Sequence, residues 1–437
     1  MDVFNIIDDH VDHTVINQKL AETMEKYDLI DQRVKRIVTD GGSNIKLAVR
    51  NSTLPGAWCL CHLMDLTVMH ALEDNNQNNR LLVQTIEKAK IIVGFYHKSI
   101  VAHKNLKDIQ QNDNMINDFI DCHYKLVNFV KTRWNSCHDM IKRMLLLYDN
   151  VNKSLISLGK YEMLLSDDEI DLLTGVSLIL TPASQYTKML EADLVPTSHL
   201  ALPLGKELLE TVSEWNPVGE DGYHTFPLSQ EVRRSLEFFK TQLQSNLQNR
   251  LRPVFDEEFY RISAFFSPTT KDLTFLTLQQ ITQVKRSIFS LMRDNTMGSS
   301  NENSQPVPIL QQQERTSIRT SLTGKFSTSS ISSGNNSTIN ANDRFRREIE
   351  RYCSSIVNPE HLQLHSDPLK YWASQEIRNA FPNLFLLAME YLHIPMSSAA
   401  SERVFSAMER TVTDLRNRLK PETASTLVFL KSHKDKW

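Results

Sequence analysis

The sequence predicts a helix-rich α/β protein. Most of the 437 residues lie in stretches whose apolar side chains recur every three or four positions, the spacing of one helix face. Glycine, which weakens helices, occurs only 12 times. Two short stretches near the amino end, residues 33–39 and 57–62, are predicted strands. A chain of this length exceeds one typical core, so we expect two or three domains.

Composition narrows the class of protein. The formal net charge of −3 argues against a wholly basic nucleic-acid binder and leaves room for a local basic groove. The five cysteines are odd in number and form no disulfide framework, which indicates reduced thiols and an intracellular protein. No apolar run approaches the ~18 residues of a membrane span, and the acidic amino end is unlike a secretory signal, so no membrane partner is expected.

The first predicted strand ends at a candidate ligand. Residues 15–29 form an amphipathic pattern, and the alternating, β-branched stretch 33–39 follows. It stops at Asp40 and two glycines, after which Ser43 or Asn44 can cap a helix. Asp40 therefore lies at the carboxyl end of a strand, where open α/β sheets hold ligands, and a carboxylate there suits Mg²⁺. A plain turn residue is the alternative.

The second predicted strand, residues 57–62, contains Cys59-Leu-Cys-His62. Cys59 and His62 supply two of the four ligands of a structural zinc site, and no second pair lies nearby, so no zinc is expected. A histidine packed in the core is an open alternative for His62.

Helical patterns continue through residues 80–130 and reach Arg133-Trp134, a pair that in isolation is a common surface or core feature. Further long helical patterns occupy 168–294. Residues 296–343 are rich in Ser, Asn, Thr and Gln and poor in aromatic residues, which predicts a disordered linker. The helical pattern resumes at residue 344.

Near the carboxyl end, a proline stops one helix and a second begins. Ser397 or Ser398 can cap the second helix, and Glu402 falls in its first turns, where the helix dipole favours a carboxylate. Small residues and Val404-Phe405 surround Glu402, so we expect a semi-buried segment in which a carboxylate needs a cation. Dipole complementation or pairing with a nearby arginine is the simpler interpretation.

Several of these motifs together resemble the hAT family of DNA transposases. The carboxyl-terminal matches follow the order of that family's dimerisation region: Asp367-Pro-Leu-Lys-Tyr-Trp372, Phe381-Pro-Asn-Leu384, Tyr391-Leu-His-Ile-Pro395, Ser401-Glu402-Arg403-Val-Phe405-Ser406, Arg416-Asn-Arg418-Leu419 and Leu427-Val-Phe-Leu-Lys431. The Thr39-Asp40 turn, Cys59-x-x-His62 and Thr132-Arg133-Trp134-Asn135-Ser136 resemble further family motifs in the family's order.

The resemblance implies a partial RNase H-like core interrupted by a large all-α insertion. Its first part is expected at 1–63, the insertion at 64–295, the disordered linker at 296–343, and the dimerisation region that completes the core at 344–437. In the family, the carboxylates equivalent to Asp40 and Glu402 bind catalytic metal ions.

The resemblance also implies contacts with DNA. His62 is expected near DNA, Arg133 on a phosphate and Trp134 stacked on an unpaired base. Cys59 and Asn44 are expected to support the site structurally.

The same resemblance implies an incomplete catalytic triad. The family's first metal-binding carboxylate lies upstream of the region that this chain matches, and no BED-type zinc finger is recognisable. We therefore expect a transposase-derived nuclear protein that dimerises and binds DNA without cleaving it, and a bound Mg²⁺ is doubtful. An active hAT transposase with a mis-assigned start is one alternative, and a helical protein-interaction module without a nucleic-acid role is another.

A homodimer or higher oligomer is expected through residues 344–437. Their helices carry more apolar surface than one helix pair covers, including Leu384, Leu387, Leu415, Leu419, Leu427 and Phe429. Packing of this surface within the same chain is the alternative.

Overall fold

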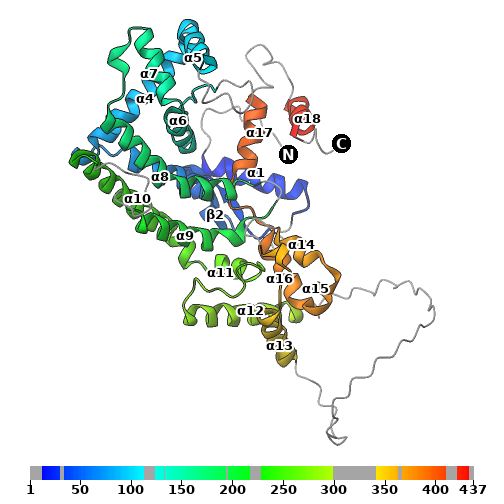
Figure 1. Cartoon of the computed structure of the whole chain (residues 1–437). Coiled ribbons are helices and arrows are strands. Elements are labelled where there is room, and N and C mark those ends of the chain that lie inside the picture. Colours follow the sequence, from blue (N-terminus) through cyan, green and yellow to red (C-terminus); the bar gives the residue numbers. More distant parts are fainter. Residues whose placement is uncertain are drawn as a thin grey trace, which may run out of the picture.

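The computed structural model describes nine stretches of the chain. They are residues 12–29, 34–112, 124–131, 133–192, 195–216, 228–298, 341–362, 367–409 and 421–432. Within them the protein is strongly helical, as predicted (Figure 1). The linker predicted at 296–343 lies almost wholly outside the described residues.

A two-stranded parallel sheet lies near the amino end. The chain runs from α1 (His13–Lys26) to β1 (Ile37–Thr39), crosses through α2 (Ser43–Asn51), and returns in β2 (Gly56–Trp58). Parallel strands require such a crossover, and α2 supplies it. Both strands were predicted, but each is shorter than the pattern suggested, because α3 already begins at Leu60.

Ser43 and Asn44 do not cap α2, contrary to the prediction. Ser43 is the first helical residue, and Gly42 precedes it without a side-chain cap. The Oδ1 atom of Asp40 instead accepts a hydrogen bond from the Gly42 nitrogen at 3.1 Å. Gly41 between them has φ +87°, a left-handed conformation that glycine adopts without steric cost.

Helices make up the middle of the chain. They are α3 (Leu60–Leu72), η2 (Gln77–Asn79), α4 (Arg80–Lys98), α5 (Ile100–Asn112), α6 (Trp134–Leu146), α7 (Tyr148–Ser157), η3 (Tyr161–Met163), α8 (Asp167–Leu190), η4 (Ser198–Leu200), α9 (Ala201–Glu214), α10 (Gln230–Asp256), α11 (Glu258–Phe265) and α12 (Leu278–Gly298).

Helix α8 lies at the centre of this group and packs against α3, α4, α6, α9 and α10. It begins with a capping box, in which Ser166 and Glu169 satisfy each other's free backbone N–H groups. A Cβ atom at Gly175 would lie 2.6 Å from the Leu236 side chain on α10, so glycine permits the close approach of these two helices. The boundary predicted at residue 63 falls inside α3, which packs into this helical core.

Residues 124–131 are not helical, although the pattern over 80–130 predicted a helix. Side chains from three helices hold this loop through its backbone. The Gln110 amide pairs with both the nitrogen and the oxygen of Tyr124, and Ser136 Oγ does the same for Val130. Polar side chains thus replace the backbone hydrogen bonds that a helix would supply.

The last part of the chain folds back onto the middle. Its helices are α13 (Ala341–Ser354), η5 (Pro359–His361), α14 (Pro368–Ala373), α15 (Gln375–Ala380), α16 (Pro382–Leu392), α17 (Ala399–Glu409) and α18 (Pro421–Ser432). Figure 1 shows α13–α16 beside α11 and α12, and α17 and α18 apart from them near α1.

Buried hydrogen bonds fix this arrangement. Trp372 Nε1 donates to the Phe266 oxygen at 2.8 Å, and Lys271 Nζ donates to the Tyr352 oxygen at 2.9 Å. Leu384 and Leu387 of α16 are fully buried inside the chain, so they are not available for the dimer surface that was predicted to contain them. Leu415 and Leu419 lie outside the described residues.

The helix-rich character of the predicted fold is confirmed. The described residues form two strands, and an RNase H-like core with an inserted helical domain stays a prediction. No helix in the described stretches has the length and apolarity needed to span a membrane.

Candidate functional site

The predicted Cys-x-x-His motif joins the sheet to the helical core. The Cys59 nitrogen donates to the Thr39 oxygen at 2.7 Å, which extends the strand pairing by one residue. The Sγ atom of Cys59 then accepts from the His62 nitrogen at 3.4 Å and caps α3. This sulfur therefore contributes to the local structure at the start of α3.

The same sulfur atom binds the chain just before α17. Cys59 Sγ accepts from the Ser398 nitrogen at 3.2 Å, and the next residue, Leu60, donates through its nitrogen to the Met396 oxygen at 2.9 Å. The neighbouring Cys61 thiol and the N–H groups of Ser398 and His62 lower the pKa of Cys59 to about 5. The pKa of Cys61 is raised by the same contact and by burial.

Helix α17 presents Glu402 and Arg403 on its first turns. Ser398 Oγ donates to Glu402 Oε1 at 3.1 Å, and the Glu402 nitrogen donates to the Ser398 oxygen at 3.0 Å. Arg403 donates to the Glu191 oxygen at the end of α8, at 2.7 Å. Both side chains are exposed, so the prediction of a semi-buried Glu402 was wrong: buried small residues such as Ser397 and Ala399 precede it, but Glu402 itself faces the cavity.

Arg133 and Trp134 lie at the start of α6. The Trp134 nitrogen donates to Asp65 Oδ1 at 2.7 Å, so a side chain of α3 caps α6. The Trp134 ring is only 2% exposed and stacks on His138, with ring centroids 6.3 Å apart. This burial corrects the expectation of an open stacking platform for a base, because the ring packs into the core. Arg133, one residue earlier, is exposed.

These elements surround one surface cavity. Its charged or titratable lining comes from α3, α6, α8 and α17: His62, Asp65, Arg133, Asp139, Glu191, Glu402 and Arg403. The structure therefore brings together four of the predicted site residues, His62, Arg133, Trp134 and Glu402, from three distant parts of the chain. Carboxylates outnumber guanidinium groups in this lining.

Two of the lining carboxyl groups carry perturbed pKa values. Burial raises the pKa of Asp65, and the hydrogen bond from Trp134 opposes that rise. Burial also raises the pKa of Glu191, and the charges of Arg403 and Arg133 oppose it. Arg133 and Arg403 thus act together on one carboxyl group.

Asp40 is placed differently from the other predicted residues. Its side chain is exposed, accepts from Gly42, and is not among the residues that line the cavity. Asn44 is also exposed, on α2.

The predicted site residues, in the positions that the structure gives them, do not form a Mg²⁺ site. Within the described stretches, no three His, Cys, Asp or Glu side chains cluster closely enough to hold a metal ion. The donor set of Asp40 and Glu402 therefore does not fit the two-metal arrangement implied by the resemblance.

Sequence reasoning missed Asp65 and Glu191. Asp65 follows His62 by three positions, so the two share a helix face, and this spacing could have identified Asp65. Glu191 ends a helix 211 positions before Glu402, and no local pattern marks it.

Comparisons with known proteins agree with the carboxyl-terminal part of this picture. Residues 348–433 match the hAT family C-terminal dimerisation region. The chain is also 20% identical over 394 residues to the human protein "Zinc finger BED domain-containing protein 4". That match covers 90% of this chain but only 30% of the relative, so the chain spans about a third of the relative's length.

Proposed function

From the hAT dimerisation region at residues 348–433, we propose that this chain is a transposase-derived protein that binds DNA in the nucleus and self-associates. One observation carries the DNA-binding part: His62 and the Arg133-Trp134 and Glu402-Arg403 motifs line a single cavity. These motifs are far apart in sequence, so their convergence is a property of the fold.

Arg133 is the expected phosphate contact at this site. Its side chain is exposed at the cavity, and a guanidinium group matches the geometry of phosphate oxygens. Asp65 holds the first turn of α6 through Trp134, so it positions Arg133. The Trp134 ring is buried, so it supports the site by packing in the core rather than by stacking on a base.

Binding without cleavage is the function that the described residues support. Glu402 has Ser398 as its hydrogen-bond partner, and Asp40 is absent from the cavity lining. No step that uses a metal ion is therefore assigned to these side chains.

The self-association part rests on α17 and α18. These helices pack against each other and bury Val428, and they leave Phe405 62% and Leu430 53% exposed. Large apolar side chains at this level of exposure favour burial against a partner. Most of the large apolar side chains of α13–α16, by contrast, are buried within the chain.

DNA binding is tested with a fluorescein-labelled duplex of arbitrary sequence and the full chain. Fluorescence anisotropy is recorded for the wild type, Arg133→Ala and the control Arg252→Ala, an 80%-exposed arginine on α10. We expect the wild type and the control to bind equally and Arg133→Ala to bind about tenfold more weakly, the order of magnitude of one lost charged contact.

Two results would change the proposal. A wild-type chain that does not bind the duplex even at low salt supports the protein-interaction module instead. Strand breaks in the presence of Mg²⁺ that disappear in Glu402→Gln support an active transposase.

A further inference from the structure

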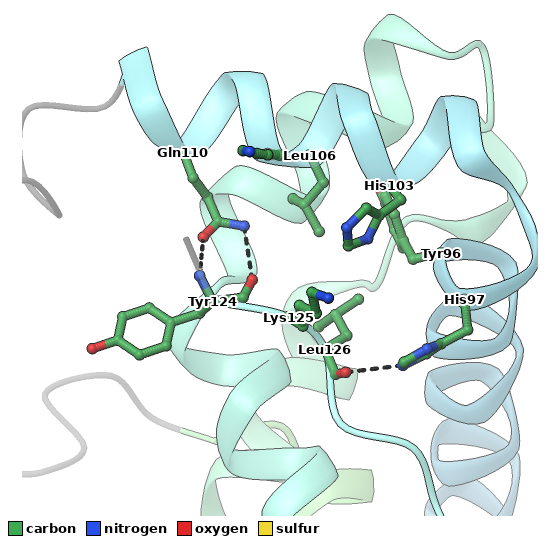
Figure 2. Close-up of a pocket in the computed structure, with 9 residues that line it drawn as sticks. Tyr96, His97, His103, Leu106, Gln110, Tyr124, Lys125 and Leu126 are labelled. Carbon is green, nitrogen blue, oxygen red and sulfur yellow. Dashed lines mark hydrogen bonds between the residues drawn. The ribbon is translucent and has the colours of Figure 1, made fainter. Parts of the chain in front are cut away.

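A positively charged feature lies next to the candidate site, at the junction of α4, α5 and the 124–131 loop. It is a shallow hollow whose polar lining includes His97, His103, Lys107 and Lys125. Figure 2 shows His97, His103 and Lys125 around the hollow, together with the buried Tyr96 and Leu106. No aspartate or glutamate is among the residues that line it.

The surroundings of the hollow are also basic. The described residues 97–112 and 124–143 contain eight lysines and arginines and two aspartates, in a chain whose formal net charge is −3. Residues 113–123, outside the described part, contain three aspartates, so the hollow rather than the whole stretch is the positively charged feature.

The 124–131 loop connects the hollow to the candidate site. Lys125 lines the hollow, whereas Asn128 and Val130 line the candidate site next to Arg133. The separation from Lys125 to Arg133 is eight residues, which span at most about 28 Å when fully extended. The two residues can therefore span at most about eight base pairs of duplex DNA at 3.4 Å per step.

Half-buried and exposed polar contacts fix the position of this loop. His97 Nε2 lies 2.9 Å from the Leu126 oxygen (Figure 2). Arg143 Nη1 donates to the Lys125 oxygen at 2.7 Å. Gln110 holds Tyr124 by both backbone atoms. The loop backbone is therefore tied to α4, α5 and α6, which fixes the spacing of Lys125 and Arg133.

The balance of charge in the candidate cavity indicates that DNA binding needs a second, positively charged surface. The lining of the candidate cavity has more carboxylates than guanidinium groups, so its balance of charge does not by itself attract a polyanion. A neighbouring hollow with lysines and histidines and no carboxylate supplies the missing attraction. Positive charges carried along one held loop suit the regular phosphates of a duplex, whose charge density is one per about 1.7 Å of helix axis.

We infer that the hollow formed by His97, His103, Lys107 and Lys125 binds the phosphate backbone of duplex DNA that also contacts Arg133. This inference rests on the proposed DNA binding and extends it by naming the path of the duplex along the 124–131 loop. The contact is independent of base sequence, because phosphates carry no sequence information.

The salt dependence of binding tests this path. The probe is the same labelled duplex, and its affinity for the full chain is measured between about 50 and about 200 mM NaCl, a range over which counterion release is readily resolved. The variants are Lys107→Gln/Lys125→Gln, the charge-preserving Lys107→Arg/Lys125→Arg, and the control Arg233→Gln/Arg234→Gln on exposed residues of α10.

We expect the Lys→Gln pair to weaken binding at least about tenfold at low salt and to make the log–log salt slope shallower by about 1.8, because each phosphate contact contributes about 0.9. The Lys→Arg pair and the control should keep the wild-type slope. Circular dichroism and the thermal midpoint verify that each variant is folded.

The possible outcomes separate the two proposals. If the wild type binds and the Lys→Gln pair matches the control in affinity and slope, the path is wrong and the DNA-binding function stands. If the Lys→Arg pair loses binding as the Lys→Gln pair does, positive charge at the hollow is not the cause, and the inference is overturned. If the wild type does not bind the duplex, the proposed function fails together with this extension of it.

Discussion

The Sγ atom of Cys59 lies 3.2 Å from the backbone nitrogen of Ser398, which is 339 positions later in the sequence. Cys59 ends the short sheet and caps α3, and Ser398 immediately precedes α17. One sulfur atom therefore sets the distance between the Cys-x-x-His motif and the helix that carries Glu402.

Removing this sulfur should loosen the start of α17. In Cys59→Ala, the nitrogens of Ser398 and His62 lose their acceptor in a buried region, which costs about 1–3 kcal/mol of unfolding free energy. Urea denaturation measures the loss. Cys59→Ser retains an acceptor and should lose less, and equal stability of Cys59→Ala and the wild type would mean that the contact is not stabilising.

Asp65 should link stability to DNA binding. Asp65→Ala removes the acceptor of the Trp134 nitrogen, and loss of a helix cap costs about 0.5–2 kcal/mol. Because the first turn of α6 follows Arg133, DNA affinity should also fall. Asp65→Asn keeps an acceptor oxygen and should restore most of both quantities. A variant Asp65→Ala with weaker folding but unchanged DNA affinity would show that Asp65 does not position Arg133.

The sequence was most informative where a local pattern is enough to define structure. The strand over 37–39, the turn at Asp40 and the helix after Pro395 all follow from periodicity and from the backbone limits of glycine and proline. The helix over Met140 and Met144 also agrees with its apolar pattern, but its start at Trp134 was not predicted. The burial of Trp134 could not be predicted, because the residues that cover its ring, including His138, belong to a fold-dependent neighbourhood.

Tertiary contacts determine the structural features that local sequence patterns could not predict. The 124–131 loop has helical periodicity, but Gln110 and Ser136 satisfy its backbone in a non-helical form. Glu402 was expected to be semi-buried from its apolar neighbours, and only the position of α17 at the rim of the cavity shows that it is exposed.

A buried histidine should make the fold acid-sensitive. Burial lowers the pKa of His199 to about 3, and its Nδ1 atom has no partner among the described residues. The unfolded chain binds a proton at the ordinary histidine pKa of about 6.5, so between about 6.5 and about 3 it holds more protons than the folded chain. Stability therefore falls as pH falls through this window, by up to about 1.4 kcal/mol per pH unit for this residue.

Denaturation midpoints between pH 7.5 and pH 4.5 test this effect of His199. His199→Leu should flatten the loss of stability toward low pH, whereas His70→Leu at an exposed position should leave its slope unchanged. A slope in His199→Leu equal to that of the wild type would contradict the assignment. Burial also lowers the pKa of His138, so this residue too makes stability fall as pH falls. It is present in both variants.

Glu348 should hold the dimerisation region together. It is 2% exposed, and its carboxylate accepts from the nitrogens of Asn383 and Leu384 at 2.9 Å and from Asn383 Nδ2 at 2.8 Å. Glu348→Ala leaves these donors without an acceptor at the start of α16. Because hydrogen bonds to charged groups contribute about 1.5–3 kcal/mol each, we expect a loss of at least about 3 kcal/mol in unfolding free energy.

The neighbouring exposed residue provides the control for Glu348. Glu350→Ala removes a carboxylate from the same helix and should change stability by less than about 0.5 kcal/mol, as is usual for surface substitutions. If the two variants unfold at the same denaturant concentration, the carboxylate of Glu348 does not stabilise α16.

Self-association should depend on α17 and α18 rather than on α16. Phe405 and Leu430 expose apolar surface, while Leu384 and Leu387 are already covered within the chain. Phe405→Glu/Leu430→Glu places charges where a partner would exclude water, so sedimentation velocity of the full chain should shift from dimer toward monomer at micromolar concentration. Leu386→Glu, at a 55%-exposed site on α16, should leave the dimer intact. A double variant that sediments as the wild-type dimer would place the interface elsewhere, and a wild-type chain that is monomeric at these concentrations would contradict self-association itself.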